Sequence, residues 1–284
     1  MSSVPARPEV VALELCLATD DLRRLRHNVQ LAARLGVQRL ELCAQMQQDG
    51  LTPALEAITL ARRFWGTQPG LMVMLRPRAG DFCYQPAEIA QLLALLPQLA
   101  DAGADAVVSG VLQHNAAGQL TLHWQALAEL NDSARQAGLT FCLHRALDAC
   151  SDPLQSWQQL TQGPVVPARI LSSGCPWQIA GSATPQAAEG AVAGIRRLQQ
   201  QLQLGGSELV VAGKVSPANL LWLRQQLDHR LITADAALQP SASVEGNVAA
   251  GVFSFHLYSA VLRDGWVDPT LLAEVLAACG SLME

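Results

Sequence analysis

The chain has 284 residues, half of them hydrophobic and 15% charged, and a formal net charge of −5. Such a composition supplies a large buried core, which excludes a disordered chain. Lys and Arg form no cluster and no apolar run reaches membrane-spanning length, so neither a nucleic-acid surface nor a membrane protein is indicated. We expect a cytoplasmic protein with small-molecule partners.

Strand-length apolar runs recur along the whole chain and alternate with helical patterns. Such runs are typical of parallel strands that helices cover on the outside. The expected strands are 10–17, 37–43, 71–75, 104–112, 139–144, 168–173, 208–213 and 230–236. The expected helices are 20–36, 52–66, 86–103, 123–138, 152–163, 184–205, 216–227 and 268–282.

Eight strands that alternate with helices predict an α/β protein with a (β/α)8 TIM-type barrel in one domain, 1–284. We assign residues 1–9 to an N-terminal extension and residues 237–266 to an irregular loop region before the last helix. A doubly wound open sheet is the alternative, because alternation of strands and helices does not by itself show that the sheet closes.

Polar residues gather where the expected strands end, which is where barrels of this kind carry their chemistry. The first two strands end in the same triplet, Glu14-Leu15-Cys16 and Glu41-Leu42-Cys43. Because side chains alternate between faces, Glu and Cys of each triplet share one face and Leu takes the other. We expect two carboxylates and two thiols in the barrel mouth.

Charged residues follow the third and fifth strands as well. The segment 75–85 carries Arg76, Arg78 and Asp81, and the segment 144–148 carries His144, Arg145 and Asp148. A buried carboxylate needs a partner, so we expect these cations to pair with Glu14, Glu41, Asp81 and Asp148. A nearly neutral polar mouth suits a small polar or anionic ligand.

Several of these segments together resemble the copper homeostasis CutC family. They are "LELC", "LELCAQMQQDGLTPAL", "LRPRAGDFCYQ", "AGADAVVSGVL", "LTFCLHRALDAC" and "ARILSSG", in the family's order between about residues 10 and 175. The resemblance implies a TIM-type barrel and a cytoplasmic homo-oligomer associated with copper tolerance. Cys16 and Cys43 match the positions proposed for copper in relatives.

The chain departs from the family pattern in its last third. A single glycine, Gly213, stands before Lys214 where the family has a glycine-rich run. After the eighth strand the family shows a His followed by small polar residues, whereas 231–238 read "LITADAAL". These two loops form the usual phosphate cradle of the fold, so we do not predict a strong phosphate site there. Lys214 and the Ser216 helix cap could hold an anion weakly.

Two functions stay open. Cu(I) favours thiolate ligands, so Cys16 and Cys43 on adjacent strands could bind it at equivalent depth; alternatively both are small buried apolar residues. The second function is a barrel enzyme of lyase, isomerase or hydrolase type acting on a small anionic, carbonyl or phosphorylated compound. Its candidate acid/base residues are Glu41, His144 and Asp148, and its candidate substrate-binding residues are Glu14, Arg76, Arg78, Asp81, Arg145, Ser173 and Lys214.

The remaining sulfur and imidazole groups are assigned to packing or to the surface. Seven cysteines without a CxxC pair indicate free thiols, and Met72 and Met74 are expected to fill the core. No organic cofactor is indicated. Ordinary surface or loop positions are expected for His27, His114, His123, His229 and His256.

Overall fold

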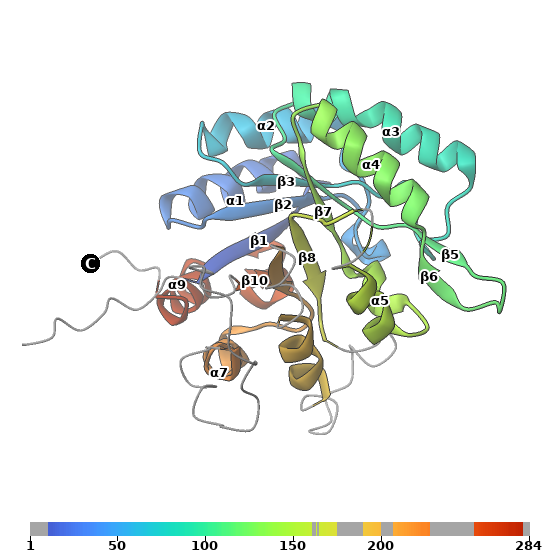
Figure 1. The fold of residues 1–284 in the computed structure, drawn as a ribbon. Helices are drawn as coiled ribbons and strands as arrows, with labels where there is room; N and C mark the ends of the chain where they lie inside the picture. The colour runs from blue at the N-terminus through green and yellow to red at the C-terminus, as the bar shows by residue number, and fades with distance from the viewer. Residues whose placement is uncertain are drawn as a thin grey trace, which may run out of the picture.

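In the computed structural model, eight parallel strands close into a barrel in the spatial order β1-β10-β9-β8-β7-β4-β3-β2 (Figure 1). The structure describes residues 11–160, 163, 165–174, 190–199, 207–227 and 253–280. The strands are β1 (Ala12–Ala18), β2 (Arg39–Cys43), β3 (Leu71–Met74), β4 (Ala106–Ser109), β7 (Thr140–Leu143), β8 (Arg169–Ser172), β9 (Glu208–Val211) and β10 (Phe253–Leu257). The (β/α)8 barrel is thus confirmed, and the open sheet is not.

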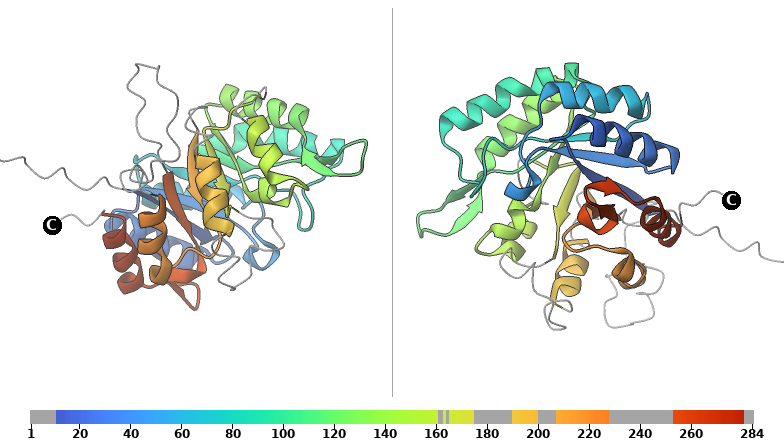
Figure 2. Two further views of the ribbon diagram at one scale, coloured as in Figure 1. Left: turned by 60° about the horizontal axis from the view of Figure 1, so that its bottom comes forward. Right: turned by 180° about the vertical axis from the view of Figure 1, so that it is seen from behind.

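Helices surround the strands on the outside (Figure 2). They are α1 (Leu22–Arg34), α2 (Leu55–Trp65), α3 (Pro86–Asp101), α4 (Trp124–Gln136), α5 (Pro153–Leu160), α7 (Pro217–Leu227) and α9 (Pro269–Ala278), with a further helical stretch at 190–199. Short elements decorate the strand ends: the hairpins β5 (Leu112–His114) with β6 (Leu120–Leu122) and β11 (Leu262–Arg263) with β12 (Trp266–Val267), and the 3-10 turns η1 (Met46–Gln48), η2 (Arg145–Ala149) and η3 (Ser259–Val261).

The eighth strand of the barrel is β10, which corrects the expected loop region 237–266. Residues 230–236, expected as that strand, lie outside the described residues. The sequence of β10, "FSFHL", alternates apolar and polar residues, because Ser254 and His256 face the barrel interior. A search for continuous apolar runs does not find such a strand.

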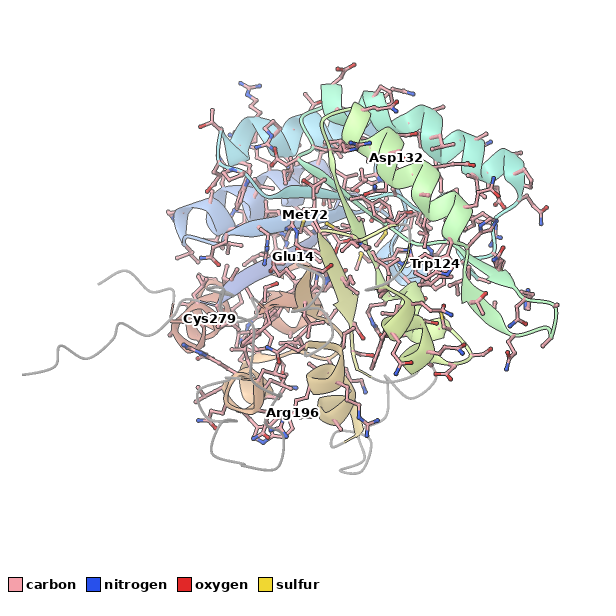
Figure 3. The ribbon with its side chains drawn as sticks, viewed as in Figure 1. Glu14, Met72, Trp124, Asp132, Arg196 and Cys279 are labelled. Carbon is pink, nitrogen blue, oxygen red and sulfur yellow. The ribbon has the colours of Figure 1, made fainter. Side chains whose placement is uncertain are left out.

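Alternation along the strands separates the core into an outer and an inner layer. Leu13, Leu15 and Leu17 of β1 belong to the large cluster between strands and helices. The barrel interior is packed by a second cluster, Met72, Ala106, Val108, Cys142, Leu171, Val210 and Ala212. Figure 3 shows Glu14 and Met72 toward the centre of the barrel, and Asp132 and Cys279 on its outer ring. The packed interior leaves the strand ends as the place for a site.

Among the described residues, no helix combines the length and apolarity that crossing a membrane requires.

Candidate functional site

A pocket of about 540 Å³ lies over the carboxyl ends of the strands. Side chains from β1, β2 and β10 line one side, and residues that follow β3, β7 and β9 line the other. The sequence-predicted residues that line it are Cys16, Glu41, Cys43, Arg76, His144, Arg145 and Lys214. Glu14, Arg78, Asp81, Asp148 and Ser173 are not among its lining residues.

The two thiols of the repeated triplet meet at the wall of this pocket. The Cys16 and Cys43 Sγ atoms are 3.7 Å apart, and both side chains are buried. Met74 completes a cluster with them, and Met46 and Tyr258 pack against it. The mouth therefore places two thiols and two thioethers together.

The register of β1 and β2 corrects the expectation that Cys16 and Cys43 lie at equivalent depth. Cys16 is opposite Glu41, and Ala18 is opposite Cys43. The two cysteines are thus offset by two residues, as the stagger of strands in a closed barrel requires. Their side chains nevertheless meet, since residues two apart on a strand share one face.

Hydrogen bonding makes the two thiols unequal. The hydrogen bond from Cys43 lowers the pKa of Cys16 to about 6; burial opposes this shift, and His256 adds a hydrogen bond and a positive charge that favour it. The same hydrogen bond, together with burial, raises the pKa of Cys43 well above its ordinary value. Cys16 is therefore a thiolate at neutral pH and Cys43 a thiol.

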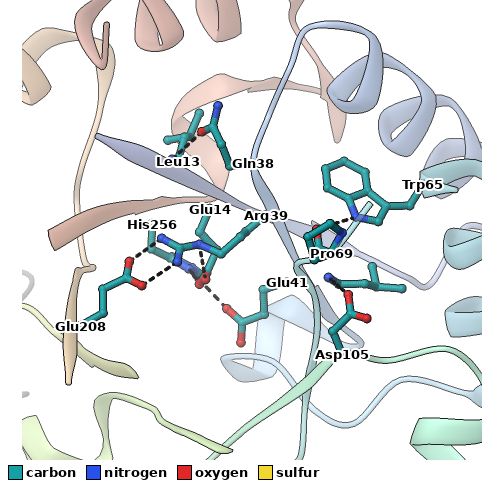
Figure 4. Close-up of polar contacts among 11 residues, drawn as sticks. Leu13, Glu14, Gln38, Arg39, Glu41, Trp65, Pro69, Asp105, Glu208 and His256 are labelled. Atoms are coloured by element: carbon teal, nitrogen blue, oxygen red, sulfur yellow. Dashed lines mark hydrogen bonds and ion pairs between the residues drawn. The ribbon is translucent and has the colours of Figure 1, made fainter. Parts of the chain in front are cut away.

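His256 lies between two buried glutamates at the same end of the barrel. Its Nδ1 is 2.8 Å from Glu14 Oε1 and 3.3 Å from Glu41 Oε2 (Figure 4). Burial lowers the pKa of His256, but hydrogen bonds to Cys16 and Glu14 and the glutamate charges raise it well above its ordinary value. The ring is thus a cation that pairs with Glu14 and the Cys16 thiolate.

The two glutamates differ in charge. Burial, the largest influence, raises the pKa of Glu14, yet the hydrogen bond and charge of His256, with Arg39 and Arg169, bring it below its ordinary value. For Glu41 burial dominates, and its pKa is raised well above the ordinary value. Glu41 Oε1 is buried without a hydrogen-bond partner. The surroundings thus favour the ionised form of Glu14 and the protonated form of Glu41.

An arginine below the mouth joins opposite parts of the barrel (Figure 4). Arg39 of β2 donates to both carboxylate oxygens of Glu208 on β9, at 2.7 and 2.5 Å. Its Nε is also 3.9 Å from Glu14 Oε2. Glu14 is therefore held from two sides, by His256 and by Arg39, and not by the arginines that the sequence suggested.

Arg76 and Arg78 do not pair with Glu14 or Glu41. Arg76 donates to four backbone carbonyls, at Gly80 and in the turn around η1, Gln48, Asp49 and Gly50. Arg78 pairs with Asp81 and Glu88 on the outside of the barrel. The expected pairing is thus confirmed for Asp81 and wrong for Glu14 and Glu41, because loop carbonyls and surface carboxylates lie closer to these two guanidinium groups than the interior glutamates do.

His144 is fixed in one tautomer. Its Nδ1 accepts the backbone N–H of Ala146 at 3.0 Å, so the neutral ring carries its proton on Nε2. Burial, the nearby charge of Arg76 and that of Arg145 lower the pKa of His144 to about 3. Nε2 has no hydrogen-bond partner. His144 is thus a neutral hydrogen-bond donor on the pocket wall.

Asp148 is wholly buried below this wall, and its two oxygens are taken up by neighbours. They accept from Ser172 Oγ at 2.6 Å, from Ser173 N and Oγ at 2.9 and 2.8 Å, and from Arg145 Nε at 3.0 Å. The expected pairing of Asp148 with Arg145 is present. The geometry fits a residue that positions Arg145 rather than one that exchanges protons.

The sequence missed His256, which was expected to be an ordinary surface or loop residue. It faces the site because β10 ends there, and Tyr258 and Ser259 follow it into the pocket lining. The absence of a histidine in 231–238 suggests a departure from the family pattern, but the eighth strand of the barrel is β10, which carries His256. The alternation of "FSFHL" is the signal that could have located it.

Fold and site together define a TIM-type barrel protein with a thiol, carboxylate and imidazole cluster at its mouth. The family model described as CutC family matches residues 11–212. The chain belongs to the CutC family. His256 lies outside the matched range, on the strand that closes the barrel.

Curated relatives and solved structures agree with this assignment. A CutC family protein from Klebsiella pneumoniae (strain 342) is 34% identical over 195 residues, which cover 68% of this chain and 70% of the relative. A Bacteroides thetaiotaomicron CutC family protein is 38% identical over 145 residues, covering 51% of this chain and 55% of the relative.

Among solved structures, the Streptococcus agalactiae CutC, provisionally named a copper homeostasis protein, superposes with a TM-score of 0.62 at 22% identity, covering 87% of this chain and 98% of that one. The Vibrio cholerae 3-keto-L-gulonate-6-phosphate decarboxylase superposes at 0.55 with 13% identity, covering 97% and 100%. Likeness at these identities shows the shared barrel.

Proposed function

We propose that the protein binds Cu(I) between Cys16 and Cys43 and takes part in copper tolerance. The observation that carries the proposal is the 3.7 Å separation of two buried sulfurs that both line the pocket. One is already a thiolate, and the other becomes one when a metal displaces its proton. Copper is then the cargo of the site.

The distance between the sulfurs suits a shared ion. Metal–thiolate bonds are about 2.3 Å long in zinc proteins, so two such bonds span at most about 4.6 Å. Sulfurs 3.7 Å apart can therefore hold one ion at a bent angle or, after a small rotation, closer to linear. Little rearrangement of β1 and β2 is needed.

The surroundings favour a soft ion. Met74 contacts the cysteine pair and Met46 packs against the cluster, which adds two thioethers to two thiols. Thiolate and thioether ligands select Cu(I) over harder cations. Such a pair stays reduced in the cytoplasm, which is where we place the protein. The name given to the Streptococcus agalactiae relative supports a role in copper homeostasis.

Anaerobic titration of Cu(I) against a competing chelator tests this proposal. We expect Cys16→Ala and Cys43→Ala each to weaken binding by at least about tenfold, since each removes a ligand. Cys83→Ala is the matched control, because that thiol lies outside the pocket lining. Equal affinities for wild type and the Cys16→Ala/Cys43→Ala double variant would refute copper binding at this pair.

A second candidate function is a barrel enzyme acting on a small anionic, carbonyl or phosphorylated compound. The observation that favours it is the unpartnered Nε2–H of His144, which can donate to a substrate oxygen beside Arg76. Glu41, whose pKa is raised by burial, is a candidate proton donor in the same pocket. His144 acts here as a hydrogen-bond donor, and not as the general acid or base that the sequence suggested.

A screen of small phosphorylated, carbonyl and carboxylate compounds with wild type and His144→Ala tests the enzyme. Loss of a hydrogen-bond donor in the pocket should lower turnover by about 10² to 10³. The rate should show no inflection near pH 6.5 from His144, whose pKa is about 3. Unchanged turnover in His144→Ala would remove this residue from the reaction.

A further inference from the structure

We propose that the mouth also holds a divalent cation of the zinc type, bound by Cys16, Glu41 and His256, as a binding mode distinct from the Cu(I) pair. One ligand atom from each of these three side chains lies within 4.8 Å of the other two. The inference does not depend on copper binding, although the two modes share Cys16.

Three neighbouring strands set the geometry of this triad. Cys16 of β1 is opposite Glu41 of β2, and β10 carries His256 on the other side of β1. All three residues line the pocket, and Cys16 and Glu41 are almost wholly buried. Since the ligands come from strands and not from loops, the barrel itself holds their spacing.

The hydrogen bond between Glu14 and His256 has the geometry of a support for a metal ligand. Glu14 Oε1 accepts from His256 Nδ1 at 2.8 Å, so a cation would bind at Nε2, in place of the proton that this nitrogen carries while the ring is charged. Histidines that bind metals commonly donate their other N–H to a carboxylate, which fixes the tautomer and the ring orientation. Glu14 is then a positioning residue and not a ligand.

The buried, unpartnered Oε1 of Glu41 points to a missing partner in the same place. A buried polar atom without a hydrogen bond is costly, and a cation bound by this carboxylate would satisfy it. Once the proton has left Glu41, one thiolate and one carboxylate match the charge of a divalent ion. Three protein ligands leave a fourth position open to water or substrate, as in catalytic zinc sites.

The donor set distinguishes this site from the copper pair. Sulfur, oxygen and nitrogen together suit Zn²⁺, whereas the thiol and thioether groups of Cys43, Met46 and Met74 suit Cu(I). Replacing Cys43 should therefore affect copper, and replacing Glu41 or His256 should affect zinc. The two binding modes can be separated because Cys43→Ala should weaken Cu(I) binding more than Zn²⁺ binding, and Glu41→Gln and His256→Ala should do the reverse.

The test measures Zn²⁺ affinity, by competition with a chromogenic chelator, and Cu(I) affinity on the same preparations. We expect Glu41→Gln and His256→Ala to weaken Zn²⁺ binding by at least about tenfold, and Glu14→Gln by about 10-fold to 100-fold. Cys83→Ala, whose thiol lies outside the pocket lining, is the matched control and should keep both affinities, whereas Cys43→Ala should lose Cu(I) binding. Co²⁺ in place of zinc should show a thiolate charge-transfer band that disappears in Cys16→Ser.

The Cu(I) affinity of each variant also shows whether the variant is folded, because Cu(I) binding needs intact β1 and β2. A larger loss of Zn²⁺ affinity than of Cu(I) affinity in His256→Ala supports the proposal. Unchanged Zn²⁺ affinity in both Glu41→Gln and His256→Ala overturns it. Equal losses of Zn²⁺ and Cu(I) affinity in both His256→Ala and the isosteric Glu41→Gln overturn it as well. In that case both metals would bind at one site formed by Cys16, Cys43, Glu41 and His256. If only the copper proposal is wrong, the wild type should still bind Zn²⁺ as expected, and Cys43→Ala should leave the Cu(I) affinity unchanged.

Discussion

The charge of Cys16 depends on its contacts with Cys43 and His256. Both contacts lower the pKa of Cys16, to about 6, although burial opposes them. Burial raises the pKa of Cys142 to about 12, and that of Cys150 and Cys279 to about 11. Among the cysteines that the structure describes, any thiolate that forms in the acid range should therefore belong to Cys16.

Ultraviolet thiolate absorbance against pH checks this assignment. As pH rises through about 6, Cys16 loses its proton, so the absorbance of metal-free wild type should rise with a midpoint near that value. Cys16→Ser should abolish this step. His256→Ala should move the midpoint upward, because it removes a hydrogen bond and a positive charge that favour the thiolate. A step that survives in Cys16→Ser would show that another group titrates.

Single residues of the site could be predicted where the same sequence triplet ends two strands, because the triplet shows which side chains share a face. The triplets ending in Cys16 and Cys43 predicted two carboxylates and two thiols in the barrel mouth; all four side chains are buried, and all but Glu14 line the pocket. Their partners could not be predicted, because pairing depends on distances between strands that lie far apart in the sequence. His256 and Arg39, which hold Glu14, come from β10 and β2.

At the scale of elements, β2 and β9 are linked through the barrel interior by Arg39 and Glu208. The two side chains are only 13% and 17% exposed, and the contact is bidentate. Removing one partner of a buried pair leaves the other charge uncompensated, which costs about 3 to 5 kcal/mol, whereas replacing both with apolar residues is often close to neutral.

We expect Arg39→Leu to lower the free energy of unfolding by about 3 to 5 kcal/mol in urea denaturation. The double variant Arg39→Leu/Glu208→Leu should recover a large part of this loss. The reason is that the lost stability comes mainly from an unpaired Glu208 and not from the pair itself. A double variant that is less stable than Arg39→Leu would contradict this interpretation.

Seven strands of the barrel overlap the strands that the sequence predicted, and the eighth does not. Continuous apolar runs identify strands buried on both faces. In β10 the inward positions are Ser254 and His256, so its pattern alternates and resembles a half-exposed strand. The polar residues of the site are thus the reason why the sequence pattern of β10 does not look like that of a buried strand. The hairpins β5–β6 and β11–β12 also escaped prediction, because each strand has only two or three residues.

In the whole molecule, barrel closure brings the end of the chain back to its beginning. His256 and Glu14 are separated by 242 positions and share a hydrogen bond across β10 and β1. One side of the pocket gathers thiols, carboxylates and an imidazole, and the other gathers Arg76, Arg145, His144 and Lys214. Such a pocket suits a metal ion and a small anion next to one another.

The central claim is that the paired thiols of β1 and β2 bind Cu(I) at the mouth of this barrel. The most direct measurement is anomalous diffraction at the copper edge from crystals grown and loaded with Cu(I) without oxygen. We predict one strong peak between the Sγ atoms of Cys16 and Cys43. A fully loaded crystal with its peak elsewhere, and none at these sulfurs, would contradict the claim.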